Sequence, residues 1–243
     1  MRNTISLFIL MITSLSLPAQ EKISFPSRDG LPVTADWYKT DERAPVIILF
    51  HQAGFSRGEY SETAKKLNTY GFSCLAVDLR SGAEANGVKN ETAAKAKEQN
   101  KPADYLASEQ DMIAAIDYVF QLRKKKVIIF GSSYSASLAL KLMKDNRKIA
   151  AVIAFSPGEY FDTMSIRKLI SGNTDKPVFV TSSKEEAPAV SVLIENLHSL
   201  SKVQFVPQRD GTHGSKALWQ SNPNNREYWM NLKLFLDTLQ GLQ

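Results

Sequence analysis

A turn of small residues between an expected strand and an expected helix carries the first side chains that could do chemistry. The stretch VIIFGSSYSASLALKLM, residues 127–143, opens with β-branched residues and closes with helix formers. A serine at the tip of so tight a turn can act as a nucleophile if its neighbours two positions away are small. Alignment on Gly131 puts Ser133 at the tip, between Gly131 and Ser135. The rival alignment centres on Ser135, and a purely structural reading makes the serines a helix cap.

A serine hydroxyl needs a base within hydrogen-bonding reach, and the chain offers three histidines. His51 ends an apolar stretch, and His198 lies in VSVLIENLHSL, which we predict to be helical. His213 lies in the glycine-flanked loop DGTHGS, after the apolar stretch KVQFVP. We expect His213 to be the base, keep His51 as a rival, and give His198 a surface or packing role.

The surrounding sequence alternates between expected strands and expected helices. The stretches expected to be strands are 21–30, 31–39, 45–50, 72–79, 126–130, 149–156, 177–182 and 202–207. Those expected to be helices are 57–71, 103–123, 135–145, 187–200 and 227–240. This order predicts an α/β fold, with a mostly parallel central sheet, an N-terminal β-hairpin and helices on both faces of the sheet.

Two polar segments, 81–102 and 158–176, match neither pattern. Each follows the carboxyl end of an expected strand, which is where ligands bind in parallel sheets. We expect both segments to form a lid or a rim over the site.

Several of these stretches together resemble the α/β-hydrolase superfamily, and in particular its small bacterial dienelactone-hydrolase-like and esterase-like members. They are the leading hairpin, LFHQAGFSRGEY, GSSYSA and GTHGS. The resemblance implies an α/β-hydrolase fold, the chain order serine, acid, histidine, and acyl-transfer hydrolysis of a small-molecule ester without a metal or organic cofactor. A dienelactone hydrolase would carry cysteine where Ser133 stands, and His51-Gln52 replaces the usual His-Gly pair. Dienelactone activity itself is therefore not implied.

The acid that orients the histidine should follow a strand between the nucleophile and the base. PVFVTSSKEEAPA supplies Glu185 and Glu186, of which we favour Glu185. Glu159 and Asp162 lie one strand earlier and stay as alternatives. Asp210 is close to the histidine in sequence and fits better as part of that loop's turn.

The oxyanion of an acyl-transfer reaction needs two N–H groups aimed at it. One should be the amide of Tyr134, directly after the nucleophile. The other should come from the loop that follows residues 45–50, where we favour the amide of Ala53 and keep Gln52 as the alternative. His51 would then hold this loop in place.

The first 19 residues have the pattern of a signal peptide. An early Arg2 precedes an apolar stretch from Ile5 to Leu17, and Ala19 offers a small residue for cleavage. We expect residues 1–19 to be removed, a single domain over 20–243, and an exported protein without a membrane span. An uncleaved anchor is the alternative.

Composition excludes few classes of function. The 243 residues are 43% hydrophobic and 23% charged, with a formal net charge of +5. The basic run 123–126 ends an expected helix, where cations complement the helix dipole, so we predict no nucleic-acid partner. Cys74 is the only cysteine, which excludes an intramolecular disulfide, and its apolar surroundings favour simple packing.

The same residues leave two other functions open. A peptidase or amidase would use an identical triad, and a non-catalytic binding protein could keep the fold without the chemistry. No pattern in the sequence predicts the oligomeric state.

Overall fold

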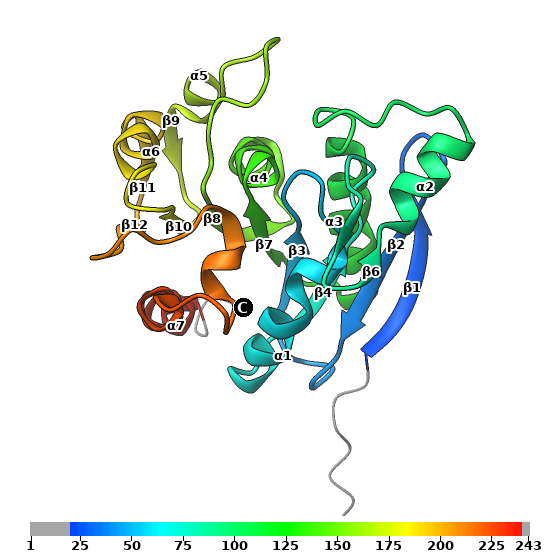
Figure 1. The fold of residues 1–243 in the computed structure, drawn as a ribbon, viewed down its shortest axis with the longest axis horizontal. Coiled ribbons are helices and arrows are strands. Elements are labelled where there is room, and N and C mark those ends of the chain that lie inside the picture. Colours follow the sequence, from blue (N-terminus) through cyan, green and yellow to red (C-terminus); the bar gives the residue numbers. More distant parts are fainter. Residues whose placement is uncertain (1–19, 240–243) are drawn as a thin grey trace, which may run out of the picture.

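The computed structural model describes residues 20–239, so the predicted signal peptide, residues 1–19, lies outside the described part of the chain. An eight-stranded sheet with the order β1-β2-β4-β3-β7-β8-β10-β12 forms the centre of the molecule (Figure 1). Its strands are β1 (Gln20–Pro26), β2 (Pro32–Tyr38), β3 (Val46–Phe50), β4 (Ser73–Val77), β7 (Val127–Ser132), β8 (Ile149–Phe155), β10 (Val178–Thr181) and β12 (Lys202–Phe205). β2 pairs antiparallel with both β1 and β4, and all later neighbours are parallel. The predicted mixed sheet with a leading hairpin is confirmed.

Helices and short strands connect these strands. The helices are η1 (Arg57–Tyr60), α1 (Ser61–Thr69), α2 (Glu91–Glu98), α3 (Glu109–Arg123), α4 (Tyr134–Asp145), α5 (Ile166–Ile170), α6 (Ala187–Leu193), η2 (Gly214–Leu218) and α7 (Asn225–Leu239). The short strands are β5 (Glu84–Ala85), β6 (Val88–Lys89), β9 (Gly172–Thr174) and β11 (Leu197–Ser199). Within residues 20–239, no helix combines the length and the apolar character needed to cross a bilayer.

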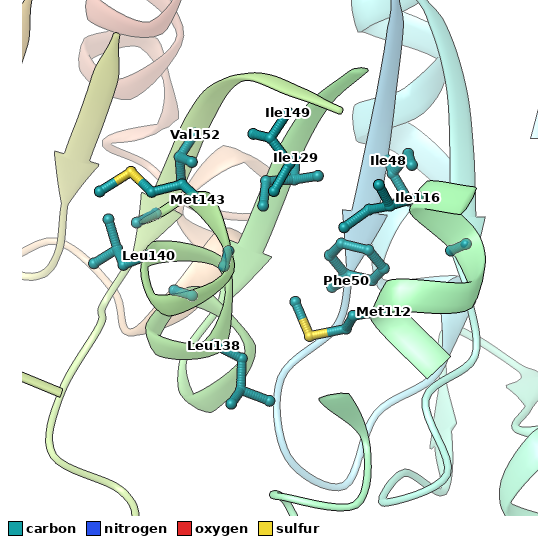
Figure 2. Packing of buried hydrophobic residues seen from close by; sticks show 14 of the residues in the cluster. Ile48, Phe50, Met112, Ile116, Ile129, Leu138, Leu140, Met143, Ile149 and Val152 are labelled. Carbon is teal, nitrogen blue, oxygen red and sulfur yellow. The ribbon is translucent and has the colours of Figure 1, made fainter. Parts of the chain in front are cut away.

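The sheet is buried on both faces because helices pack on each side. Side chains of α3, α4, α5 and α6 form one core with the sheet, and those of α1 and α7 form the other. The sequence of β3 is apolar without alternation because both of its faces are buried. Ile48 and Phe50 lie in the first core, and Ile47 and Leu49 lie in the second. Figure 2 shows Met112 of α3 packed beside Phe50 in the first core.

The second core contains the single cysteine. Cys74 is fully buried there, and burial raises the pKa of its thiol, which suits packing and not chemistry.

The predicted helix over 187–200 is wrong in its second half. α6 ends at Leu193, and residues 197–199 form β11, which pairs in parallel with β9. Leu197 is buried in the first core, whereas His198 is exposed to solvent. Pairing with a distant strand therefore outweighs the local helical preference of these residues.

The two segments without a predicted structure are partly regular. Residues 81–102 contain the β5–β6 hairpin and α2, and residues 158–176 contain α5 and β9.

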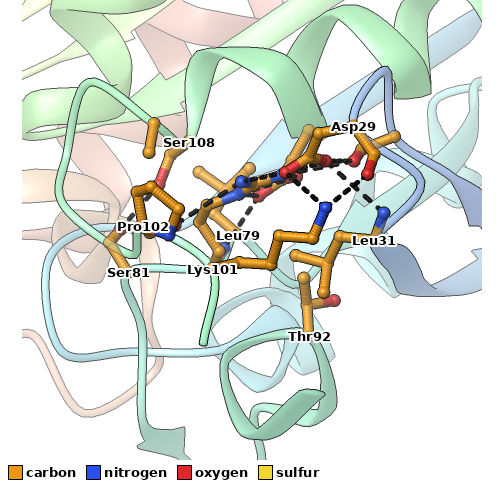
Figure 3. Close-up of polar contacts among 12 residues, drawn as sticks. Asp29, Leu31, Leu79, Ser81, Thr92, Lys101, Pro102 and Ser108 are labelled. Carbon is orange, nitrogen blue, oxygen red and sulfur yellow. Dashed lines mark hydrogen bonds and ion pairs between the residues drawn. The ribbon is translucent and has the colours of Figure 1, made fainter. Parts of the chain in front are cut away.

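Ion pairs and hydrogen bonds fix the two ends of segment 81–102 against the leading hairpin. Arg80 Nη1 donates to Asp29 Oδ2 at 2.9 Å and Arg80 Nη2 to Asp111 Oδ1 at 2.8 Å. Lys101 Nζ donates to the Asp29 carbonyl at 2.6 Å, so Asp29 ties both ends of the segment (Figure 3). Figure 3 also shows Ser108, whose hydroxyl donates to Ser81 Oγ at 2.9 Å. Segment 81–102 is therefore tied at both ends to the turn of the leading hairpin.

Candidate active site

Ser133 stands at the tip of the turn between β7 and α4. Its φ of 60° and ψ of −126° are an unusual conformation for a residue with a side chain. A Cβ atom on Gly131 would come within 2.4 Å of the Ser135 carbonyl oxygen and 2.5 Å of Ala136 Cα. The turn therefore leaves no room for a larger residue at 131.

Ser135 occupies the second small position for a reason that the structure makes clear. Its hydroxyl accepts a hydrogen bond from the Ser132 amide at 2.9 Å and donates one to the Phe50 carbonyl at 2.8 Å. It is fully buried within the first turn of α4. The alignment that centres on Ser135 is thus not the one that the fold adopts.

The partner of His213 is Glu186, which corrects the sequence-based preference for Glu185. His213 Nδ1 and Glu186 Oε1 form a short hydrogen bond. Glu186 Oε2 accepts from Ser156 Oγ at 2.7 Å and from the Ser183 amide at 3.0 Å. These donors turn Glu186 inward, whereas its neighbour Glu185 is exposed to solvent.

Ser156 is a site residue that the sequence analysis missed. It directly follows β8, with a positive φ of 53°. Its hydroxyl donates to Glu186 and accepts from the Gly214 amide at 2.9 Å, so it joins the loop of the acid to the loop of the histidine. Its place at the carboxyl end of a parallel strand is the one sequence signal that could have indicated it.

The histidine loop packs directly against the turn that carries Ser133. The Ser215 amide donates to Ser132 Oγ at 2.9 Å. Gly214 has a φ of 70°, and a Cβ there would lie 2.7 Å from Ser132 Oγ and 2.4 Å from Gln52 Oε1. Ser133 and His213 therefore lie on segments that contact each other at the same edge of the sheet.

The other acids considered from sequence have different partners. Glu159 accepts hydrogen bonds from the amides of Ile166 and Arg167, at 2.6 and 2.9 Å, and so caps α5. Asp162 and Asp210 are exposed, and the Asp210 carbonyl accepts from the amide of Lys184.

His51 is buried and holds the loop after β3. Its Nε2 accepts from the Leu79 amide at 2.8 Å, so the ring proton is on Nδ1, which donates to the Gln52 carbonyl at 2.8 Å. Burial lowers the pKa of His51 to about 4. The Phe55 amide donates to the same carbonyl, and since the peptide is planar and trans, the Ala53 N–H points the opposite way.

Two of the three amides considered for an oxyanion hole are available. The Gln52 amide already donates to Glu59 Oε2 at 2.7 Å, which argues against Gln52. Within residues 20–239 no hydrogen bond uses the amide of Ala53, or that of Tyr134. Tyr134 begins α4, and the first amides of a helix have no partner in their own helix.

Open space lies beside the His213–Glu186 pair, and an aromatic side chain lies near Ser156. A groove of about 520 Å³ runs along His213 and Glu186, between residues 183–186 and 210–213. Segment 158–176 contributes Tyr160, whose hydroxyl donates to the Ser156 carbonyl at 2.9 Å. Ser133 itself is 6% exposed. Among the residues described, no cluster of His, Cys, Asp and Glu could hold a metal ion.

Comparison with known proteins gives the family. Residues 33–204 match the family model described as the dienelactone hydrolase family. The chain belongs to this family. No curated protein matches the chain in sequence.

Solved structures share the fold of this dienelactone hydrolase family member at low sequence identity. The chain is similar to an esterase from Pyrococcus furiosus, with 16% identity, a TM-score of 0.69 and coverage of 90% of this chain and 92% of the esterase. It is also similar to a dienelactone hydrolase from Anabaena variabilis, with 14% identity, a TM-score of 0.69 and coverage of 91% and 98%. An acylaminoacyl peptidase from Pyrococcus horikoshii matches with 17% identity and a TM-score of 0.63, over 93% of this chain and 42% of the peptidase.

The contacts of Glu186 lead us to expect that the folded protein loses stability in acid. Burial raises its pKa, but hydrogen bonds from His213, Ser156 and the Ser183 amide outweigh burial and lower the pKa from 4.5 to about 2. Between these two values the unfolded chain takes up a proton at this position and the folded chain does not, so stability falls as the pH falls through this window. We expect the free energy of unfolding, measured in urea, to fall over this pH range in the wild type. The fall should be smaller in Glu186→Gln. If the free energy of unfolding depends on pH identically in the two proteins, the contacts assigned to the Glu186 carboxylate would be contradicted.

Proposed function

We propose that this family member is a serine hydrolase that cleaves a carboxylic ester through an acyl-enzyme intermediate. One observation carries the proposal: Ser133 stands at a strained strand-to-helix turn, against the loop of a histidine whose Nδ1 is bonded to Glu186. Membership of the dienelactone hydrolase family and the likeness to an esterase fold support the same class of reaction.

The proposed reaction begins with attack by Ser133 Oγ on the ester carbonyl. His213 Nε2 accepts the serine proton, because Nδ1–H is directed at Glu186, whose negative charge then stabilises the imidazolium. The amides of Ala53 and Tyr134 donate to the oxyanion. His213 returns the proton to the leaving alcohol, and a water activated by the same nitrogen then releases the acid.

The predicted signal peptide adds a proposal about location. Residues 1–19 carry the sequence pattern of an export signal, so we propose that the mature enzyme acts outside the cytoplasm. Recovery of the full-length chain, uncleaved, in the cytoplasmic fraction of an expressing bacterium would argue against export.

A substrate panel tests the proposed activity. Nitrophenyl esters from acetate to long acyl chains are assayed beside amino-acid nitroanilides. We expect turnover of esters. The acyl length that gives the highest kcat/KM then indicates the size of the acyl pocket. Turnover of anilides alone would make the protein a peptidase or amidase. Folded protein that turns over neither series and resists a fluorophosphonate probe would be a binding protein.

A further inference from the structure

A fully buried carboxylate lies beneath the site and takes no part in the reaction proposed above. Glu59 belongs to η1, between β3 and α1, and is 0% exposed. Within residues 20–239 no salt bridge reaches its carboxylate, whose oxygens accept hydrogen bonds from neutral donors. Removing a carboxylate from water is costly unless such donors replace the lost hydration.

The donors come from three separate segments of the chain. The Gln52 amide, in the loop after β3, donates to Oε2 at 2.7 Å. Ser132 Oγ, directly before the nucleophile, donates to Oε1 at 2.8 Å, and Ser215 Oγ, two residues after the histidine, donates to Oε1 at 2.5 Å. One side chain therefore contacts each of the three segments that carry Ala53, Ser133 and His213.

Further contacts lock this arrangement. Ser132 Oγ accepts from the Ser215 amide at 2.9 Å while it donates to Glu59, so its hydroxyl orientation is fixed. Trp219 Nε1 donates to the Glu59 carbonyl at 2.8 Å, which holds the backbone of η1 against the segment after η2. The Gln52 amide can only donate and both serine hydroxyls donate here, so all three contacts can be made to an ionised carboxylate.

We propose that Glu59 is a positioning residue that holds the oxyanion loop, the nucleophile turn and the histidine loop in their working geometry. The inference rests on the proposed function, since it assigns Glu59 to that same site. Through the Gln52 amide, Glu59 fixes the start of the loop in which the Gln52 carbonyl directs the Ala53 N–H. Small errors in such placement cost large factors in rate.

The replacement Glu59→Gln separates this role from simple packing. Glutamine keeps the volume, and its amide oxygen can still accept from Ser132 and Ser215. Its NH₂ group then faces the Gln52 N–H, so two donors oppose each other. We therefore expect the variant to lose the hydrogen bond from the Gln52 amide, which holds the oxyanion loop, and to keep those from Ser132 and Ser215.

Kinetics on the best ester of the panel provide the main readout. We expect Glu59→Gln to lower kcat about 10- to 100-fold with KM changed much less, because the loss is felt in the transition state. The affinity for an alkyl trifluoromethyl ketone, which forms a tetrahedral adduct with an active serine, should fall by a similar factor. A merely structural residue would lower stability without this split between kcat and KM.

Asn68→Asp is the matched control. Asn68 is also buried, on α1, and its Nδ2 donates to the carbonyls of Tyr38 and Phe72 at 3.1 and 2.8 Å, away from Ser133. The exchange of amide for carboxylate should lower the urea midpoint and leave kcat within about twofold of the wild type.

Hydrogen exchange at the Gln52 amide gives a readout that needs no substrate. Faster exchange in folded Glu59→Gln than in the wild type supports the role even if the wild type cleaves no ester, in which case only the proposed function fails. Unchanged exchange together with unchanged kcat overturns the role. If Glu59→Gln does not fold, Ser215→Ala removes one contact alone, and unchanged kcat in that variant would count against the proposal.

Discussion

Replacement of Ser133 by alanine is expected to lower kcat/KM for ester hydrolysis by about 10³- to 10⁶-fold. The hydroxyl is the proposed bond-forming group, and what remains in the variant is binding and the oxyanion amides. Alanine can adopt the same backbone conformation as serine, so the fold should be retained. Kinetics on the best nitrophenyl ester, with circular dichroism as the check on folding, measure the effect.

Ser135→Ala is the informative companion variant. Ser135 is buried and bridges the Ser132 amide and the Phe50 carbonyl, so its loss leaves polar groups without partners and should cost about 1–3 kcal/mol in stability. The variant should still react with a fluorophosphonate probe. Normal turnover in Ser133→Ala, with loss of labelling in Ser135→Ala, would move the nucleophile to the rival position.

Replacement of Glu186 by glutamine should cost about 10³- to 10⁴-fold in kcat. Ser156 and Ser183 would hold the amide oxygen of the new side chain, because both donate to Oε2 of Glu186. The NH₂ group would then face His213 Nδ1 and force the ring proton onto Nε2. That nitrogen could no longer accept the proton of Ser133.

Glu185→Gln is the matched control for this change. The two glutamates are adjacent, but Glu185 is exposed. Surface substitutions of this kind change free energies by about 0.5 kcal/mol or less, so we expect kcat within about twofold of the wild type. A large loss of kcat in Glu185→Gln and none in Glu186→Gln would restore Glu185 as the acid, as the sequence favoured.

The fold and the tight turn at Ser133 could be predicted because local physics decides them. β3 reads as a buried parallel strand since both of its faces lie in a core. The turn at Ser133 requires a residue without a side chain at Gly131, and this requirement is visible in four or five letters of sequence.

The sequence could not decide which glutamate contacts His213, because contacts between distant segments decide it. Glu185 and Glu186 are the same residue type in the same stretch of sequence. What distinguishes Glu186 is its hydrogen bond from Ser156, which follows a separate strand. Likewise, Glu59 stands in a polar stretch typical of an exposed helix start, and only the folded chain brings Ser132 and Ser215 to it. The wrong second half of the helix predicted over 187–200 has the same origin, because residues 197–199 pair with β9 as a strand.

Mapping the covalent adduct of a fluorophosphonate probe tests the central claim most directly. The intact wild-type protein is treated with the probe, and its mass and its peptides are then determined. We expect one adduct per chain, on Ser133, formed slowly or not at all in Glu186→Gln and absent in Ser133→Ala. Folded protein that hydrolyses esters while it carries no adduct, or carries its adduct on another residue, would contradict the proposed mechanism.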